Sequence, residues 1–312
     1  MARWLLPEGI SDVLPGEAQF LETLRRAALD LYRGYGYELV VPPLLEYTDS
    51  LLTGVGADLD LRTFKLVDQL SGRMLGLRAD ITPQVARIDA HILNRPGVVR
   101  LCYAASVLHA RPLHPLASRE PFYVGAELFG SASVAADAEV LELAVRTLAL
   151  ARVDAVGFDL GHTRILRALL DLDPKAQRLA EDIVAALSAK DAAALVPLTD
   201  GLEPAARAAL RALVRLHGDT GVLAAARETL PKLAAVEAAL DELQALATTL
   251  SRLGARASVD LADLHGFRYH TGVTFAAYAD AWPVALARGG RYDDVGRAFG
   301  RARPATGFSI DL

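Results

Sequence analysis

Apolar residues near the start of the chain recur every three or four positions. One face of the helix that this spacing predicts carries Phe20, Leu21, Leu24, Ala28 and Leu31. Gly34 and Gly36 follow and are expected to end the helix. The pattern predicts an amphipathic helix that packs its apolar face against a core.

Shorter apolar runs in the rest of the first half predict strands. They lie at residues 37–41, 63–67, 74–77, 98–104, 122–130 and 155–160. The second and third of these runs flank the turn at Ser71-Gly72 and are predicted to form a hairpin. Helices are predicted at residues 82–93 and 137–149. Strands that pair mostly in antiparallel order beside helices indicate an α+β fold.

The pattern changes between residues 164 and 254, where alanine, leucine and arginine dominate and strand patterns disappear. The last helix there has an apolar face made of Leu233, Val236, Leu240, Leu243, Leu250 and Leu253. Strand patterns then resume at residues 258–263, 273–279 and 306–310. We therefore predict a core formed by residues 1–163 and 255–312, interrupted by an all-helical insert at residues 164–254.

Composition and charge narrow the classes of function. Hydrophobic residues make up 52% of the chain, enough for a sizeable core. The sequence has no apolar run of membrane-spanning length and no N-terminal secretory signal, so a cytoplasmic location is expected. The formal charge of −5 argues against a nucleic-acid partner, because such partners require a basic surface. The single cysteine, Cys102, is expected to be a buried, inert thiol, and the seven histidines lack metal-ligand spacing, so neither a metal nor another cofactor is predicted.

A polar segment, Leu-Arg-Ala-Asp-Ile-Thr-Pro-Gln, stands at residues 77–84. Asp80 and Thr82 offer a carboxylate and a hydroxyl, which suit an ammonium group that is removed from water. The same side chains suit the cap of the helix predicted to follow. The two roles are compatible, and the sequence leaves the choice open.

Two further segments combine aromatic residues with glycines. One is Leu-His-Gly-Phe-Arg-Tyr-His-Thr-Gly-Val-Thr-Phe at residues 264–275, and the other is Ala-Arg-Gly-Gly-Arg-Tyr-Asp-Asp at residues 287–294. Glycines allow the backbone to approach a ligand closely. A Gly-Gly-Arg-Tyr segment alone also fits a tight hairpin turn with an exposed aromatic ring.

Together with residues 36–46, 106–130 and 304–312, these segments resemble the motifs of histidyl-tRNA synthetases, and they occur in the same order. The resemblance implies a class II aminoacyl-tRNA synthetase-like fold, an antiparallel sheet flanked by helices. It also implies that Asp80, Thr82 and Glu127 hold the ammonium group of histidine. The predicted histidine-binding residues are Asp80, Thr82, Arg111, Tyr123, Glu127, His265, Tyr269 and Tyr292.

Three of the synthetase positions for ATP and transfer chemistry differ in this chain. Leu108 aligns with the arginine that grips the α-phosphate of ATP, Ala110 with its glutamate partner, and His265 with a catalytic arginine. An aliphatic side chain cannot stabilise charge on a phosphoryl group. The sequence also ends at Leu312, before the last ATP-binding arginine and the anticodon-binding domain of the synthetases, so we expect neither of these. No catalytic residue is predicted.

This combination, with the segment at residues 77–88 and the form Tyr-His-Thr-Gly, resembles the regulatory subunits of ATP phosphoribosyltransferase. The resemblance implies a subunit without catalytic activity that is required for the first step of L-histidine biosynthesis. It implies a short-form catalytic subunit as partner, L-histidine as feedback effector, and a homodimer within a hetero-oligomer. Two alternatives are a divergent, truncated histidyl-tRNA synthetase or other adenylate-forming enzyme, and a tRNA-binding module without catalysis.

Overall fold

The chain divides into two compact units. The computed structural model describes residues 4–54, 57–112, 114, 117–153, 155–280, 282 and 284–312. One unit comprises Met1–Ser131 with Asp293–Leu312, and the other comprises Ala132–Tyr292. The predicted insert at residues 164–254 lies within the second unit, together with part of the predicted core.

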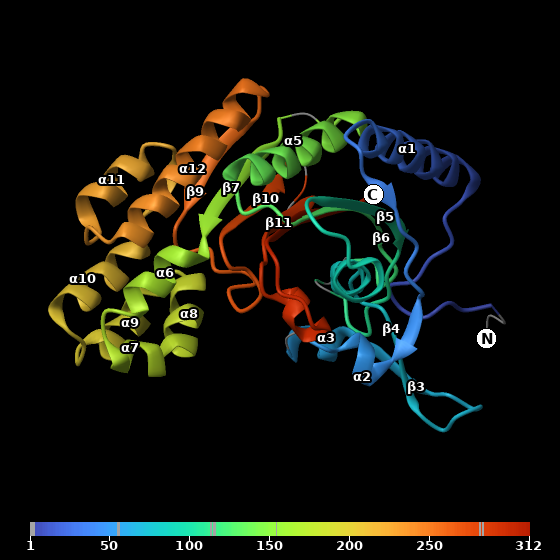
Figure 1. Cartoon of the computed structure of the whole chain (residues 1–312), viewed down its shortest axis with the longest axis horizontal. Coiled ribbons are helices and arrows are strands. Elements are labelled where there is room, and N and C mark those ends of the chain that lie inside the picture. The colour runs from blue at the N-terminus through green and yellow to red at the C-terminus, as the bar shows by residue number, and fades with distance from the viewer. Residues whose placement is uncertain are drawn as a thin grey trace. The chain divides into compact units, whose positions relative to one another are not determined.

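The first unit is built on the strands β1 (Glu38–Leu39), β5 (Val99–Ser106), β6 (Phe122–Phe129) and β12 (Ala305–Asp311), in that spatial order. The helix α1 (Pro15–Gly34) packs on β5 and β6, as the apolar face in its sequence predicts (Figure 1). Its Tyr32 is fully buried and meets the ring of Phe308 edge-on, with 5.9 Å between the ring centroids. This contact holds α1 against β12, the neighbour of β6 in the sheet.

A smaller three-stranded sheet also belongs to the first unit. Its strands are β2 (Leu45–Tyr47), β4 (Met74–Leu77) and β3 (Phe64–Val67), in the order β2-β4-β3, and β3 with β4 forms the predicted hairpin. The short helices of the unit are α2 (Thr48–Leu51), α3 (Ala57–Arg62), α4 (Thr82–Arg87), the π-helix η1 (Ile88–Leu93) and the 3₁₀ helix η2 (Val295–Phe299). The helix predicted at residues 82–93 therefore forms, but it changes from α to π geometry at Ile88.

The second unit contains β11 (Ala287–Arg291), β10 (Val273–Tyr278), β7 (Gly157–His162), β9 (Arg256–Asp260) and β8 (His217–Asp219), in that spatial order. The helix α12 (Ala234–Arg252) packs on β7, β9 and β10, and α5 (Val134–Leu150) packs on β11 and on α12 (Figure 1). Phe158 and Leu160 of β7 are buried, whereas Asp159 between them is half-buried. The alternation in β7 thus distinguishes a face directed at the core from a more polar face.

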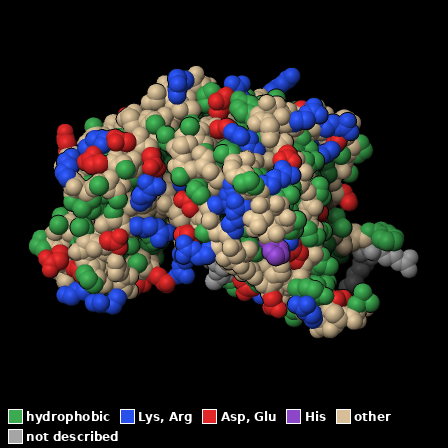
Figure 2. Space-filling view, in the orientation of Figure 1, with side chains coloured by type: hydrophobic (Ala, Val, Ile, Leu, Met, Phe, Trp, Pro, Cys, Tyr) green, Lys and Arg blue, Asp and Glu red, His purple; other side chains and the backbone are tan. Residues whose placement is uncertain are grey.

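Six helices precede α12 in the insert. They are α6 (Thr163–Leu170), α7 (Pro174–Arg178), α8 (Ala180–Ser188), α9 (Ala192–Thr199), α10 (Pro204–Leu213) and α11 (Val222–Thr229). The face shown in Figure 2 carries basic and acidic side chains close together over these helices. None of the helices in the described part of the chain is both long and apolar enough to cross a bilayer.

The predicted α+β fold is confirmed, with two corrections. The insert is not all-helical, because β8 pairs antiparallel with the edge of β9 and so satisfies backbone groups there. The pairing is mixed and not purely antiparallel, since β1 pairs with β5 and β7 pairs with β9 in parallel. The second parallel pair arises because the helical insert returns the chain to the sheet in the same direction, as crossover connections do.

Candidate functional site

A buried carboxylate lies at the centre of the first polar site. Glu127 on β6 is fully buried and accepts a hydrogen bond of 2.8 Å from the hydroxyl of Thr82 at the start of α4. The phenol of Tyr103, also fully buried, donates to the same carboxylate oxygen over 3.3 Å. We call Asp80, Thr82, Tyr103 and Glu127 the acid cluster. The structure thus brings together two of the predicted ammonium-binding residues, Thr82 and Glu127.

Two glycines make room for this arrangement. Gly307 on β12 pairs in register with Glu127, and a Cβ at position 307 would lie only 1.6 Å from Oε2 of that glutamate. Gly125 faces Tyr103 in the β5–β6 register, and a Cβ there would lie 2.4 Å from the Tyr103 hydroxyl. Any other residue at either position would displace a member of the acid cluster. The backbone of the sheet therefore sets the positions of both polar groups.

Asp80 lies one residue before Ile81, the N-cap residue of α4, so its carboxylate contacts the backbone just ahead of the helix. Its Oδ1 accepts hydrogen bonds from the backbone N–H groups of Ile81, over 2.6 Å, and Thr82, over 3.3 Å. Burial raises the pKa of the Asp80 carboxyl, and the two backbone N–H groups oppose that rise. The contacts fix Asp80 at the start of α4, and its predicted contact with an ammonium group stays a prediction.

His109 and Tyr123 belong to the segment at residues 106–130, and His109 contacts the backbone beside Asp80. His109 is fully buried, its Nε2 lies 3.1 Å from the carbonyl of Ala79, and its ring meets that of Tyr123 with 6.4 Å between centroids. Burial lowers the pKa of His109, so its imidazole is held neutral. The predicted residue Tyr123 is thus half-buried against a neutral ring, whereas Arg111 is exposed.

The second site is a stack of two tyrosines in the other unit. Tyr292, directly after β11, is 2% exposed and stacks on Tyr269 with 5.2 Å between centroids. We call these two residues the aromatic pair and residues 264–272 the aromatic loop. The next residue of the loop, His270, meets Tyr269 edge-on with 5.3 Å between centroids. The structure therefore brings together two of the predicted histidine-binding residues, Tyr269 and Tyr292.

Glycines again set the position of a ring. A Cβ at Gly266 would lie 2.7 Å from Nδ1 of His270, and a Cβ at Gly290 would lie 2.8 Å from Cδ2 of the same ring. Gly266 also has a φ of +69°, a left-handed conformation that glycine adopts without strain. Burial lowers the pKa of His270 to about 4, which keeps its imidazole neutral.

His265, the remaining predicted residue, is exposed and lies against Asp263. Its Nδ1 and its backbone N–H both contact Oδ1 of that carboxylate. The hydrogen bond that His265 donates to the Asp263 carboxylate raises the pKa of His265. A histidine paired in this way is positively charged over a wider pH range, and its predicted contact with a ligand stays a prediction.

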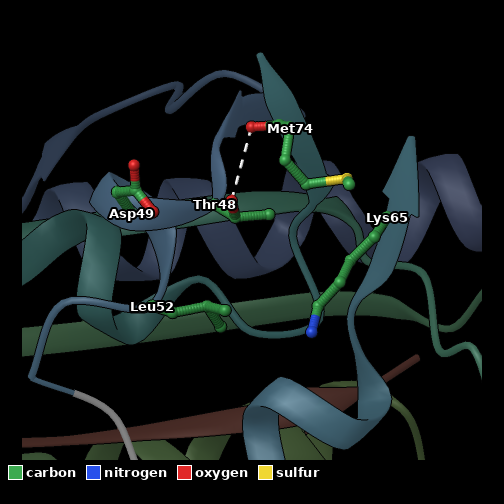
Figure 3. Close-up of a pocket in the computed structure, with 5 residues that line it drawn as sticks. All are labelled: Thr48, Asp49, Leu52, Lys65 and Met74. Carbon is green, nitrogen blue, oxygen red and sulfur yellow. Dashed lines mark hydrogen bonds between the residues drawn. The ribbon is translucent and has the colours of Figure 1, made fainter. Parts of the chain in front are cut away.

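Other parts of the described chain offer less for a ligand. A surface hollow in the first unit is lined by Thr48, Asp49, Leu52, Lys65 and Met74, where Thr48 donates to the carbonyl of Met74 over 3.4 Å (Figure 3). None of the predicted site residues lines it. Among the described residues, no three His, Cys, Asp or Glu side chains are arranged to hold a metal ion. Cys102 is buried, and burial raises the pKa of its thiol to about 12, which makes it the inert thiol that was predicted.

Tyr103, His109 and His270 are the residues that sequence reasoning did not assign to a site. Tyr103 was predicted only as part of a strand, although a buried tyrosine needs a partner for its hydroxyl. His109 and His270 were considered only as metal ligands. For Tyr103 the available signal was Gly125, and for His270 it was Gly266 and Gly290, because each of these glycines marks a close approach to the ring. No glycine marks His109 in this way.

The fold and the order of these residues define a class II histidyl-tRNA synthetase-like protein. The sequence profile of the family described as histidyl-tRNA synthetase matches residues 9–312. A crystal structure of an ATP phosphoribosyltransferase regulatory subunit/histidyl-tRNA synthetase from Bacillus halodurans matches with a TM-score of 0.89 and 28% identity, over 100% of this chain and 82% of that chain.

Two further proteins are similar to the chain, one in sequence and one in fold. An ATP phosphoribosyltransferase regulatory subunit of Cupriavidus pinatubonensis is 60% identical over 309 residues, which cover 99% of this chain and 80% of the relative. The ATP phosphoribosyl transferase (HisG:HisZ) complex from Thermotoga maritima contains a chain with the same fold, at a TM-score of 0.71 and 18% identity, over 97% of this chain and 98% of that chain. The chain belongs to the ATP phosphoribosyltransferase regulatory subunit family, within the histidyl-tRNA synthetase-like proteins.

Proposed function

We propose that this chain is the regulatory subunit of an ATP phosphoribosyltransferase and makes the activity of a separate catalytic subunit responsive to L-histidine. One observation carries the proposal. The acid cluster that suits an amino acid is intact, whereas Leu108 and Ala110 stand where the synthetases handle ATP. The chain therefore recognises histidine without activating it.

The acid cluster supplies the contact with the ammonium group of histidine. A hydrogen bond to a charged partner contributes roughly 1.5–3 kcal/mol, about twice the value for two neutral groups. Glu127 is held in place by Thr82 and Tyr103, so it needs little reorganisation when a cation binds. A Kd of tens of micromolar corresponds to only about 6 kcal/mol, which a few such contacts and one apolar contact supply.

The aromatic pair supplies the contact with the imidazole ring. Tyr269 and Tyr292 are stacked with an interplanar angle of 29°, and such faces suit a second flat ring. The neutral ring of His270 beside them adds no positive charge that would repel a protonated imidazole. The remaining predicted residues, Asp80, Arg111, Tyr123 and His265, are proposed to complete the contacts with histidine.

The absence of adenylate chemistry follows from the side chains at the ATP positions. Leu108 is half-buried, and its backbone N–H donates to the carbonyl of Arg78 over 2.9 Å. Neither its side chain nor the methyl group of Ala110 can donate a hydrogen bond to a phosphate. Loss of one donor to a developing charge costs about 10²–10³ in rate, so a residual synthetase activity would be very slow.

The test is to co-express the chain with the short-form catalytic subunit of the same organism and to purify the complex. Phosphoribosyl transfer to ATP is then measured with and without the chain, over a range of histidine concentrations. We expect the chain to raise the activity and to make it sensitive to histidine, with a coupling of about 1–3 kcal/mol. A catalytic subunit that is equally active and equally sensitive without the chain would refute the proposal.

The match to the synthetase family favours one second candidate, a slow histidyl-tRNA synthetase. Histidine-dependent exchange of pyrophosphate into ATP by the isolated chain distinguishes the two functions. Exchange well above that of a protein-free control would support the synthetase, and exchange at background level supports a regulatory subunit.

We further propose that the chain forms a homodimer within the hetero-oligomer. Four apolar side chains are exposed in the segment at residues 36–46: Leu39 by 52%, Val41 by 81%, Leu44 by 42% and Leu45 by 41%. Large exposed apolar side chains gathered in one short segment are typical of a surface that is covered in an assembly, and a two-fold interface buries the same residues on both copies. Light scattering on the isolated chain is expected to give twice the mass of 33.3 kDa.

A further inference from the structure

One arginine of the insert holds the aromatic loop. Arg167 on α6 donates from Nη2 to the carbonyl of Phe267, over 2.7 Å, and to the carbonyl of His270, over 3.1 Å. Its guanidinium also lies over the ring of Phe267, 4.5 Å from the centroid. A single side chain thus contacts two backbone groups and one ring of the same loop, and a planar guanidinium is suited to such combined contacts.

The first residue of the same helix binds the end of the loop. Thr163 is 1% exposed, and its backbone N–H donates to the carbonyl of Gly272 over 3.0 Å. Its hydroxyl lies 3.1 Å from that carbonyl and 3.2 Å from the carbonyl of His270. Three carbonyls of the loop, those of Phe267, His270 and Gly272, therefore accept hydrogen bonds from α6.

The start of α6 is in turn bonded to the last helix of the insert. Glu242 on α12 lies 3.0 Å from Nε2 of His162 and accepts a hydrogen bond of 3.0 Å from Arg164. Nδ1 of His162 accepts from the backbone N–H of Arg164, which caps α6. The hydrogen bond from His162 lowers the pKa of Glu242 to about 2, so this carboxylate stays ionised. The loop, α6 and α12 thus form one continuous set of polar contacts.

The other side of the loop leads to the aromatic pair. Thr271 donates from its backbone N–H to the carbonyl of Arg291, over 2.8 Å, directly before Tyr292. Arg291 is itself held by a buried ion pair of 2.9 Å with Asp137 on α5. The position of Tyr292 is therefore fixed by β11 and α5, whereas the position of Tyr269 depends on the loop that Arg167 holds.

We propose that Arg167 is a positioning residue that sets the aromatic pair for its ligand and transmits ligand binding to the helical insert. The proposal rests on the proposed function, because it takes histidine as the ligand of the aromatic pair. Ligand bound against Tyr269 stabilises the loop, and the stabilised loop strengthens the contacts of its carbonyls with α6. The insert thereby acts as the element of the second unit that responds to histidine.

The test compares Arg167→Met, which keeps the apolar stem and removes the donors, with Arg167→Lys, which keeps one charged donor. Arg207→Met is the matched control, because Arg207 lies in the same insert and donates over 3.3 Å to a carbonyl within it, that of Asp200. Amide hydrogen exchange and histidine affinity by calorimetry are measured on the full chain. Hydrogen exchange of the ligand-free protein tests the contact of Arg167 with the loop even if the chain binds no histidine.

We expect Arg167→Met to raise exchange in residues 264–272 and to weaken histidine binding, each by about tenfold, as the loss of a charged donor to backbone predicts. Arg167→Lys is expected to lie between this variant and the wild type, and Arg207→Met to stay within about twofold of the wild type. Histidine should slow exchange in α6 and α12 of the wild type but not in those of Arg167→Met. If Arg167 only stabilised the fold, histidine would still slow exchange in α6 and α12 of Arg167→Met.

Each other outcome decides between the two proposals. If the wild type binds histidine and Arg167→Met matches it in affinity or in the response of α6 and α12, the positioning role is refuted. The same holds if Arg207→Met weakens binding as strongly as Arg167→Met. If the wild type binds no histidine, the proposed function fails and this inference with it, and loop exchange that still depends on Arg167 would then identify a structural anchor alone.

Discussion

The acid cluster and the aromatic loop are built in opposite ways. Glu127 and Tyr103 stand on neighbouring strands, and Gly307 and Gly125 leave the space that they fill. Only the end of the aromatic loop bonds to a strand, through the backbone N–H of Thr271, and three of its carbonyls accept hydrogen bonds from α6. The first region is fixed by the sheet, and the second is fixed by contacts that a neighbouring helix supplies.

This difference assigns different roles to the two regions. A carboxylate on a rigid sheet presents the same charge with and without ligand, so it contributes affinity without reporting occupancy. A loop whose position depends on a few polar contacts can be shifted by a ligand that strengthens those contacts. We therefore expect substitutions in the acid cluster to change affinity and substitutions in the loop to change the response.

The largest effect is expected for Glu127→Gln. The amide keeps the volume of the side chain and still accepts from Thr82, but it removes the charge that pairs with an ammonium group. Losing one partner of a buried charge pair costs about 2–5 kcal/mol, so histidine affinity should fall by a factor of at least about 30. Calorimetry with the isolated chain measures this directly.

The matched control for this variant is Glu17→Gln on α1, where the carboxylate is exposed. It should bind histidine as the wild type does. Equal affinities of the Glu127→Gln variant and the wild type would mean that the acid cluster does not hold the ammonium group, and the contrast between the two regions would lose its basis.

A smaller effect is expected on the stability of the first unit from Gly307→Ala. The new methyl group would meet the Glu127 carboxylate, whose Cδ lies 2.5 Å from the Cβ position, and strands β6 and β12 would have to separate. Overpacking of this kind costs roughly 1–3 kcal/mol, which lowers the Tm by about 2–4 °C per kcal/mol in a chain of this size.

Gly16→Ala in the first turn of α1 serves as the comparison, because nothing outside the local helix backbone lies within 4 Å of its Cβ position. Alanine there is expected to leave the Tm unchanged or to raise it slightly. Thermal unfolding of both variants by circular dichroism checks the difference. A Gly307→Ala protein as stable as the Gly16→Ala protein would show that the sheet adapts, and that its register does not fix the acid cluster.

Local patterns were sufficient to predict most of the fold. The apolar spacing in residues 20–31 predicted α1, and the alternating runs predicted β5, β6 and β10. Pairing partners were less accessible, because parallel pairing of β7 with β9 depends on where a long helical insert returns the chain. The strand β8 was missed because its three residues, His217, Gly218 and Asp219, carry no strand pattern and pair only through backbone groups.

Residue types predicted part of the candidate site. They did not predict the contacts that form only when segments distant in sequence come together. Asp80, Thr82 and Glu127 could be named from their motif, but the hydrogen bond of Tyr103 to Glu127 requires the β5–β6 register. The anchoring of the aromatic loop by Arg167 joins residues 100 and 103 positions apart in sequence. No local pattern in an alanine- and leucine-rich insert distinguishes this arginine from its neighbours.

The smallest effect is a dependence of stability on pH that comes from the aromatic loop. The pKa of His270 is about 4 in the folded protein and near 6.5 in the unfolded chain. Between these values the unfolded chain binds more protons, so stability is fully present above pH 6.5 and falls as the pH drops towards 4. Urea unfolding at pH 7 and pH 5 should therefore show a smaller loss of stability for His270→Gln than for the wild type.

Burial lowers the pKa of His109 and His162 as well, so the His270→Gln variant keeps part of the pH dependence. His217→Gln, at an exposed position on β8, should lose as much stability as the wild type. Equal losses in all three proteins would mean that His270 is hydrated in the folded loop, and that the loop is more open than its contacts with Arg167 require.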